Sequence, residues 1–261
     1  MQLQNPSKRF QAERLKMGLV ITQPIQNPYR TNPVASVIMC AHNHLLDLSI
    51  PCIESIRKST YYPYELILID DGSDDRSIQY FQTVTGKAFR VPKRGGIAKA
   101  RNIGFFSGAG DPFVFLDNDV LLPPEWLTIL VQESQKAGVG IVSAIPSNEI
   151  SRLNAPMSSD WLLEFPHVGG FCTAITRRCF NVVGYFDESL MNNGEDTDFC
   201  YRARERGFRV ANTPRLTVKH LSGGTRRELP KREIERAARR FRKKYQRHPD
   251  LPTPPLYPFG A

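Results

Sequence analysis

The sequence predicts an α/β fold in which a mostly parallel, Rossmann-like central sheet is flanked by helices and followed by a less regular second half. Short apolar runs rich in β-branched residues alternate with longer stretches of helical pattern, as in chains built from β-α-β units. Two of the apolar runs end directly in paired aspartates, at 70–71 and 117–119. Because ligands of open α/β sheets bind beyond the carboxyl ends of the strands, both acid pairs are expected at one crevice.

The first half of the chain shows this alternation clearly. The apolar runs predict strands over 34–41, 64–69, 89–91, 113–116 and 139–144. Helices are expected over 46–58, between the second and third strands, and over 95–107. A further helix opens at Pro123-Pro124, because proline suits the first helical turn.

The second half of the chain is less regular. It predicts short strands over 171–176, 208–211 and 216–220, and helices over 196–206 and 229–245. The last helix carries one apolar stripe that ends at Tyr245.

The pattern divides the chain into three parts. Residues 1–33 are polar and rich in proline, and they form an N-terminal extension. Residues 34–225 form the main domain, with a nucleotide-binding half over about 34–120 and an acceptor half over about 121–225. Residues 226–261 form a basic amphipathic helix and a proline-rich tail.

The formal net charge of +9 is concentrated near the C-terminus. Between Arg226 and Arg247 there are 11 Lys or Arg residues and 3 Glu residues, so the rest of the chain is close to neutral. This distribution, without an aromatic-interleaved basic surface, disfavours nucleic acid as a partner. The basic helix is either a solvated face or a peripheral contact with anionic lipid through 231–247.

Cysteine usage and hydropathy indicate a cytoplasmic protein, peripheral to the inner face of a membrane if the basic helix binds lipid. No apolar run reaches the roughly 20 residues that cross a bilayer, and the N-terminal residues lack the apolar core of a secretory signal. The five cysteines are scattered among apolar residues without a CxxC pair, which is typical of buried thiols in a reducing compartment.

The acid pairs at the two strand ends predict a metal site. Asp117 and Asp119, two residues apart in extended chain, point to the same side. Two carboxylates on one side suit Mg²⁺ or Mn²⁺, with a diphosphate supplying further oxygen ligands. The alternative is that such acids only cap the helices that follow them.

Three further features leave their roles open. The acids of Gly194-Glu-Asp-Thr-Asp198 either cap a helix or include a general base. His220, at the end of a predicted strand, is either structural or a ligand of the kind that Mn²⁺ accepts. The backbone N–H groups of Gly95 and Gly96 could face a phosphate, although this segment lacks the Gly-Lys-Ser/Thr of a phosphate loop.

Taken in order, these segments resemble the family 2 glycosyltransferases, which have the GT-A fold. The resemblance covers roughly 34–225, and although each motif is common alone, the ordered set is specific. The matching segments are VIMCAHN at 37–43, LIDDGS at 68–73, GGIAKARN at 95–102, FLDND at 115–119, GG at 169–170, GYFDE at 184–188, GEDTD at 194–198, GFRV at 207–210, and His220.

The resemblance implies roles for single residues. It implies a pocket that binds the nucleobase and ribose of a nucleotide-sugar donor, with further donor contacts beside it. The residues of this pocket and its surroundings are Ala41, His42, Asn43, Asp71, Arg94, Asn102, Asp117 and Asn118. It implies that Asp117, Asp119 and His220 bind the metal, Mn²⁺ or Mg²⁺. It also implies that Asp196 is the catalytic base and that Glu195 lies beside it near the acceptor.

The implied reaction is a single displacement with inversion, in which a sugar passes from a nucleoside diphosphate to an acceptor hydroxyl. UDP is the expected carrier, with dTDP and GDP open, and the acceptor is a glycan or lipid-linked glycan. The first-strand motif departs from the usual pattern at His44-Leu45-Leu46, and 147–168 matches nothing that identifies the acceptor. Two alternatives stay open: a non-catalytic nucleotide-sugar or glycan-binding module, and a phosphatase suggested by the DxD strand end.

Overall fold

The computed structural model describes residues 34–59, 63–149, 161–191, 193–221 and 231–245. The predicted N-terminal extension, the proline-rich tail and most of the unassigned segment 147–168 lie outside the described residues.

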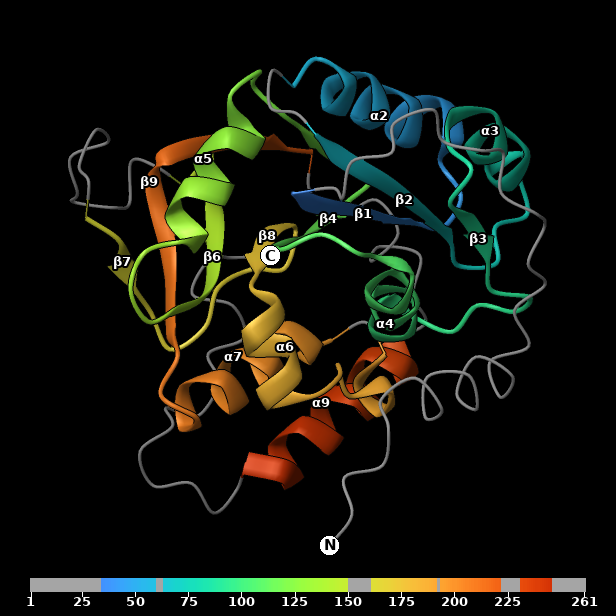
Figure 1. Ribbon diagram of the computed structural model, residues 1–261. Coiled ribbons are helices and arrows are strands. Elements are labelled where there is room, and N and C mark those ends of the chain that lie inside the picture. Colours follow the sequence, from blue (N-terminus) through green and yellow to red (C-terminus); the bar gives the residue numbers. More distant parts are fainter. Residues whose placement is uncertain (1–33, 60–62, 150–160, 192, 222–230, 246–261) are drawn as a thin grey trace, which may run out of the picture.

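The centre of the molecule is a nine-stranded mixed sheet (Figure 1). Its strands follow the order β3-β2-β1-β4-β8-β6-β9-β5, with β7 paired to β9. Their bounds are β1 (Ala35–Ala41), β2 (Tyr64–Asp70), β3 (Ala88–Arg90), β4 (Phe113–Asp117), β5 (Val120–Leu121), β6 (Val139–Pro146), β7 (Leu163–Glu164), β8 (Cys172–Ile175) and β9 (Arg209–His220).

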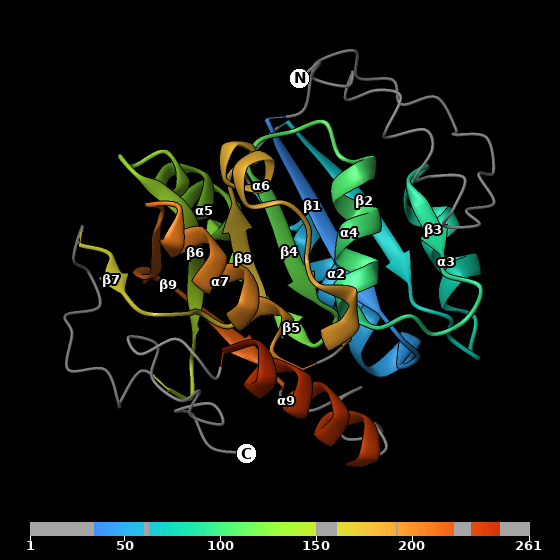
Figure 2. The same cartoon turned by 90° about the horizontal axis from the view of Figure 1, so that it is seen from below.

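Helices cover both faces of the sheet (Figures 1 and 2). On one face lie α2, α3 and α5; on the other lie α4, α6 and α7, with α9 packed beyond α7. The bounds are η1, a π-helical turn (Leu45–Ser49), α2 (Ile50–Arg57), α3 (Ser77–Val84), α4 (Ile97–Ser107), α5 (Trp126–Ser134), α6 (Arg177–Val183), the 3₁₀ turn η3 (Glu188–Leu190), α7 (Glu195–Glu205) and α9 (Lys231–Tyr245).

The buried strands supply both cores because alternate side chains point to opposite faces. In β1, Val37 and Met39 pack with α2, α3 and α5, whereas Ile38 and Cys40 pack with α4, α6 and α7. A strand buried on both faces is mostly apolar, which is why 34–41 is apolar except for Ser36 and does not alternate.

The parallel block β3-β2-β1-β4 sets the position of the acid pairs. Ala41 pairs with Asp70, and Cys40 pairs with Asp117, so both acidic segments leave the same edge of the sheet. The prediction that both acid pairs lie at the carboxyl ends of the strands, at one edge of the sheet, is therefore confirmed.

Beyond β4 the sheet curls back on itself. β8 is antiparallel to both β4 and β6, and β9 then runs parallel to β6. The two-residue strand β5 follows β4 almost directly in sequence, yet it pairs with β9 at the far end of the strand order. The residues that join β4 to β5 are Asn118 and Asp119, so the acidic turn closes the curl.

The prediction of two short strands over 208–211 and 216–220 is wrong. One continuous strand, β9, crosses the polar stretch that contains Pro214. The ladder between β6 and β9 shifts register between Ser143 and Ile145, and there the Asn212 amide donates to the carbonyls of Ser143 and Ala144. These side-chain hydrogen bonds replace the backbone hydrogen bonds that are missing at the register shift, so the strand continues.

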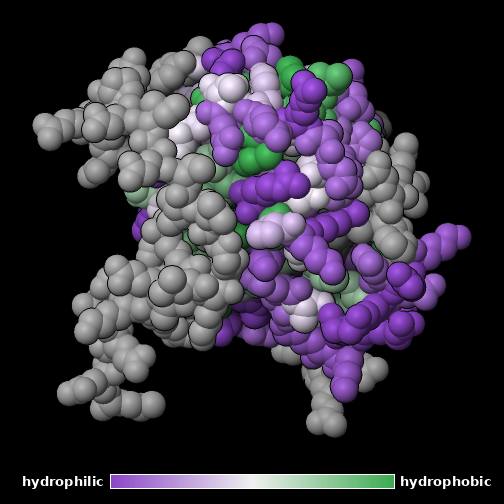
Figure 3. Space-filling view, turned by 90° about the vertical axis from the view of Figure 1, so that its right-hand side faces the viewer, coloured by the Kyte–Doolittle hydropathy of each residue, from purple (hydrophilic) through white to green (hydrophobic). Residues whose placement is uncertain are grey.

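The structure also contains elements that the sequence reasoning did not predict. These are β5, β7, α6 and η3, all of seven residues or fewer. The predicted burial of the five cysteines is confirmed, since all five are free and buried. The face that carries α3 and β3 is mostly hydrophilic among the described residues (Figure 3), and no described helix is long and apolar enough to cross a bilayer.

Candidate active site

The structure brings together Asp117, Asp119 and His220, as predicted. One ligand atom from each lies within 4.8 Å of the others. The backbone explains this convergence: His220 pairs with Val120 across β5 and β9, and the Leu221 N–H donates to the Asp119 carbonyl at 2.9 Å. Two carboxylates and one imidazole, held by a strand end and a ladder, are a donor set that fits Mn²⁺ or Mg²⁺.

His220 is held tightly in this cluster. Its Nε2 lies 3.2 Å from Asp119 Oδ1, and its ring stacks on Phe171 with centroids 4.8 Å apart. Burial alone would lower the pKa of His220, but the paired Asp119 and the nearby Asp117 raise it overall. The two carboxylates therefore favour the charged form of the imidazole.

Arg101, on α4, joins the metal-ligand cluster to the acids of α7. Its guanidinium is buried and donates to Asp117 Oδ1 at 3.1 Å and to Glu195 Oε1 at 3.1 Å. It also donates to the Gly170 carbonyl at 2.9 Å. One cation thus connects β4, the start of α7 and the segment before β8.

The sequence reasoning missed Arg101, although a signal for it exists. Arg101 lies four residues from both Ile97 and Phe105, which pack against the core on the same side of α4. An arginine on the apolar side of a buried helix must have an ionised partner, because an unpaired buried charge is strongly destabilising.

Asp196 and Glu195 begin α7, as the resemblance implied. They follow Gly194, whose φ of 87° gives the chain the left-handed turn that opens the helix. Asp196 Oδ2 accepts from the Gly170 N–H at 3.1 Å, and Oδ1 accepts from the Thr197 N–H at 2.7 Å. Two backbone donors suit an ionised carboxylate.

Glu195 differs from its neighbour in protonation. Burial raises the pKa of Glu195 to about 8, with the negative charge of Asp196 adding to the shift and Arg101 opposing it. Arg101 is shared with Asp117, so it cannot fully compensate Glu195 as well. At neutral pH Glu195 therefore keeps its proton.

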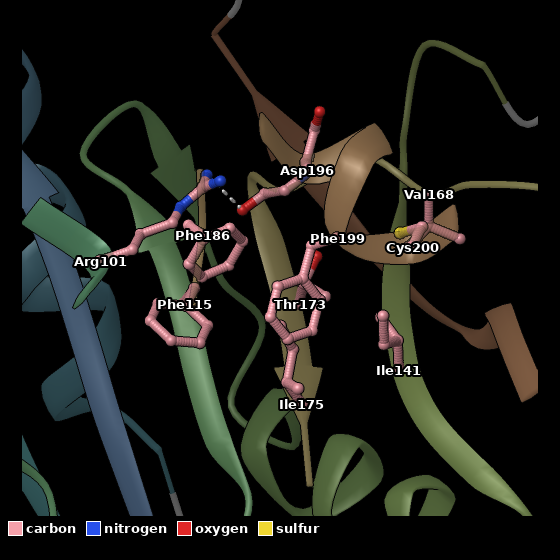
Figure 4. A pocket seen from close by; sticks show the side chains of 11 residues that line it. Arg101, Phe115, Ile141, Val168, Thr173, Ile175, Phe186, Asp196, Phe199 and Cys200 are labelled. Carbon is pink, nitrogen blue, oxygen red and sulfur yellow. Dashed lines mark hydrogen bonds between the residues drawn. The ribbon is translucent and has the colours of Figure 1, made fainter. Parts of the chain in front are cut away.

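A small cavity lies beneath these acids. Arg101 and Asp196 are at one end of it, and the rings of Phe115, Phe186 and Phe199 line its sides (Figure 4). Its volume of about 10 Å³ is enough for about one water molecule, so it is a packing void under the site and not a substrate pocket.

Asp71 and its neighbours form the donor side of the crevice. Asp71 accepts from the N–H groups of Gly95 at 2.7 Å and of Gly96 at 2.9 Å. The expectation that these N–H groups face a phosphate is wrong, because the Asp71 carboxylate uses both. Glycine is needed at Gly96 because its φ of 88° is a backbone conformation that residues with a Cβ rarely adopt.

The residues that follow β1 brace the same edge. The Ala41 carbonyl accepts from the Asp71 N–H at 2.8 Å, and His42 Nδ1 lies 2.8 Å from the Asp71 carbonyl. Asn43, with a φ of 57°, donates its N–H to Ser73 Oγ and accepts from the Asp74 N–H, both at 2.8 Å. These predicted nucleotide-binding residues therefore lie together and lock the two loops into one surface.

Arg94 lies beside this surface with unused hydrogen-bonding capacity. Its Nε and Nη2 are buried and have no hydrogen-bond partner among the described residues. A guanidinium with two buried, orphaned nitrogen donors is suited to an anionic group.

Asn102 and Asn118, two predicted donor-binding residues, face the interior. The Asn102 amide binds the backbone of Phe186 in both directions and also donates to Glu188 Oε1 at 3.0 Å. Asn118 Nδ2 donates to Ser49 Oγ at 2.9 Å. Both side chains brace loops around the site, and a direct contact with a donor stays a prediction.

The raised pKa of Glu195 predicts a pH-dependent stability. The folded pKa of about 8 lies above the ordinary value of 4.5, so the folded state holds a proton that the unfolded state releases. The free energy of unfolding therefore falls as pH rises from about 4.5 to 8, by at most about 1.4 kcal/mol per pH unit. Glu195→Gln lacks this titrating group and should not show this loss. Relative to the wild type, its free energy of unfolding should therefore rise by about 1–3 kcal/mol between pH 5 and pH 9.

Urea unfolding with a metal chelator present measures this difference. Glu125→Gln is the control, because the Glu125 side chain is exposed and its substitution should change the pH dependence little. Parallel stability curves for wild type and Glu195→Gln across this pH range would show that Glu195 is ionised in the folded protein.

Comparisons with known proteins agree with this fold. Residues 36–181 match the family described as Glycosyl transferase family 2. The chain is 26% identical to polypeptide N-acetylgalactosaminyltransferase 15 of Homo sapiens, over 75% of this chain and 37% of that protein. It is also 26% identical to the inactive polypeptide N-acetylgalactosaminyltransferase-like protein 5 of Macaca fascicularis, over 73% of this chain and 52% of that protein. The chain thus spans about half or less of these relatives.

Two solved structures share the fold. The mannosyltransferase PcManGT from Pyrobaculum calidifontis, in complex with GDP-Man and Mn²⁺, has a TM-score of 0.66 at 21% identity, covering 96% of this chain and 73% of that one. GalNAc-T7 with UDP, GalNAc and Mn²⁺ has a TM-score of 0.61 at 20% identity, covering 72% of this chain and 43% of that one. The predicted GT-A fold is confirmed, and the family match over more than half of the chain shows that this protein belongs to glycosyltransferase family 2.

Proposed function

We propose that the protein is an inverting, divalent-metal-assisted glycosyltransferase that moves a sugar from a nucleoside diphosphate to an acceptor hydroxyl. The observation that carries this proposal is the link through Arg101 between the metal-ligand cluster and the acids of α7. Such a link places the groups that would serve the leaving diphosphate and the attacking hydroxyl on one rigid framework.

The donor side has residues suited to a metal-bound nucleoside diphosphate. Asp117, Asp119 and His220 would hold the cation, which when bound neutralises charge on the departing diphosphate. Arg94 offers orphaned donors beside Asp71 for the same anionic group. A UDP-sugar is the proposed donor; the two solved structures of this fold hold UDP and GDP-Man, each with Mn²⁺.

The acceptor side has one residue suited to proton transfer. Asp196 takes the proton of the acceptor hydroxyl as that oxygen attacks the anomeric carbon from the face opposite the diphosphate. Glu195 keeps its own proton at neutral pH and cannot compete for this role. The family resemblance supports inversion, and the acceptor is proposed to be a glycan or lipid-linked glycan.

A non-catalytic binding module is the second candidate, and one observation favours it. The relative from Macaca fascicularis is named inactive, so the fold also occurs without activity. Against this candidate, the acids expected for metal binding and base catalysis are all present in this chain. Family membership leaves the phosphatase alternative without support.

Replacing Asp196 tests the base. Asp196→Asn should slow transfer of the sugar by about a hundredfold or more, because positioned bases contribute about 10²–10⁴-fold. The rate is measured as release of nucleoside diphosphate from a panel of UDP-, dTDP- and GDP-sugars with Mn²⁺, with water or added glycans as acceptor. Asp47→Asn, an exposed acid, is the control. An unchanged rate in Asp196→Asn would assign the base elsewhere, and no turnover in the wild type with any donor would favour the binding module.

Removing a metal ligand tests the cation site without an activity assay. Mn²⁺ should raise the melting temperature obtained with UDP, because a ligand at a hundred times its Kd stabilises the folded state by about 2.7 kcal/mol. Asp119→Asn should lose the increment due to Mn²⁺, whereas Asp47→Asn should keep it. An increment that survives in Asp119→Asn would place the cation on other residues.

The outer face of α9 supports peripheral membrane contact. Arg232, Arg236, Arg239 and Lys243 are exposed and follow the 4-3-4 spacing of one helix face. The apolar residues of α9 pack on the protein, with Phe241 against Tyr201, so contact with lipid would be by charge and not by insertion. The five buried free thiols support a reducing compartment, and we place the enzyme in the cytoplasm at an anionic membrane face.

Vesicle sedimentation tests this contact. The protein should bind vesicles that mix phosphatidylglycerol with phosphatidylcholine, and it should not bind phosphatidylcholine alone. Changing the four outer residues to glutamine should weaken binding on the order of a hundredfold or more, at about 1 kcal/mol per charge. Equal binding by both proteins would exclude α9 as the contact, and preferential binding to nucleic acid would replace lipid as the partner.

A further inference from the structure

Asp198 is a buried acid that neither the metal cluster nor the proposed base accounts for. It lies in the first turn of α7, two residues after Asp196, and its side chain has no exposed surface. Arg202 Nε donates to its Oδ2 at 2.8 Å. Lys244 Nζ lies 2.5 Å from its Oδ1, and the Tyr245 hydroxyl donates to the same oxygen at 2.7 Å.

Two of these three partners come from the last turn of α9, a helix far from α7 in sequence. Lys244 also binds Asp187 Oδ2 at 2.9 Å. It therefore bridges the acid that precedes η3 and the acid in the first turn of α7. A buried carboxylate needs partners for its charge, and α9 supplies most of them.

Other residues of α9 contact the segment that precedes α7. Arg240 donates to the Ser189 carbonyl at 2.7 Å, and Asn193 Nδ2 donates to the Ile234 carbonyl at 3.3 Å. The Phe241 ring fills the space beside Gly194, where an added Cβ would lie only 2.9 Å from the ring.

The other side of this loop rests on the donor half. The Ala98 N–H donates to the Met191 carbonyl at 3.2 Å, and Met191 lies so close to Gly96 that a Cβ there would be 3.1 Å away. Gly96 in turn holds Asp71. The loop that carries Glu195 and Asp196 is therefore clamped between α4 and α9.

We propose that Lys244 and Tyr245 are positioning residues for Asp196, and that α9 is part of the active-site scaffold in addition to being a basic surface. By fixing Asp198 they hold the first turn of α7, and with it the direction of the Asp196 carboxylate. This inference rests on the proposed transferase function. Its physical basis is that a displacement of about 1 Å at a reacting group can cost on the order of a hundredfold in rate.

Two lysines of α9 offer a matched experiment. Lys244 pairs with Asp198, whereas Lys231, in the first turn of the same helix, is exposed and has no ion pair among the described residues. Lys244→Met and Tyr245→Phe should lower kcat about tenfold and leave the KM for the nucleotide sugar within about twofold. Lys244→Arg should recover part of the lost kcat, and Lys231→Met should match the wild type.

Hydrogen exchange gives a second readout that needs no substrate. The amides of 195–198 should exchange faster in Lys244→Met and Tyr245→Phe than in Lys231→Met, because the first turn of α7 opens more often. A lower melting temperature with unchanged kcat and unchanged exchange at 195–198 would show that α9 only stabilises the fold. An inactive wild type would instead contradict the proposed function, and the exchange result would still decide whether α9 fixes this turn.

Discussion

The buried Arg101 guanidinium is the interaction on which the site depends. It satisfies a carboxylate at the end of β4, a carboxyl at the start of α7 and a backbone carbonyl before β8. These three segments are distant in sequence and would otherwise bring uncompensated acids together. Because Glu195 is buried with it and Asp117 is partly buried, losing the cation would leave acids that could be accommodated only by protonation or by movement.

Arg101 carries one positive charge and does not neutralise all the acids around it. This shortage of positive charge shifts the pKa values of the neighbouring groups. Glu195 responds by keeping a proton, while the pKa of His220 is raised by the acids on the other side. The acids of this site therefore favour positive charge beside them, whether as protons or as the divalent cation that we propose.

Sequence reasoning found Asp117 and Asp119 because they stand at the end of an apolar run, where the fold class places ligands, whereas the roles of Glu195 and Asp196 came from the family resemblance. It missed Arg101 because α4 reads as an ordinary helix unless its apolar side is checked for charge. It split β9 because Pro214 interrupts the apolar pattern, and a compensating side-chain amide such as that of Asn212 leaves no periodic signal. Asn102 and Asn118 were assigned to the donor because a motif gives a residue's place in the chain and not the direction of its side chain.

The pairing of β5 with β9 has a consequence for how the protein is made. The ladder that seats His220 beside Asp119 joins residues about a hundred positions apart, and it closes the curl of the sheet. Contacts of such long sequence separation form late, since the loop between them must be ordered first. During synthesis, a chain whose two aspartates have left the ribosome before β9 therefore contains only part of the proposed cation site. Full affinity for the cation becomes a property of the finished sheet, and the cation would stabilise only chains that have completed it.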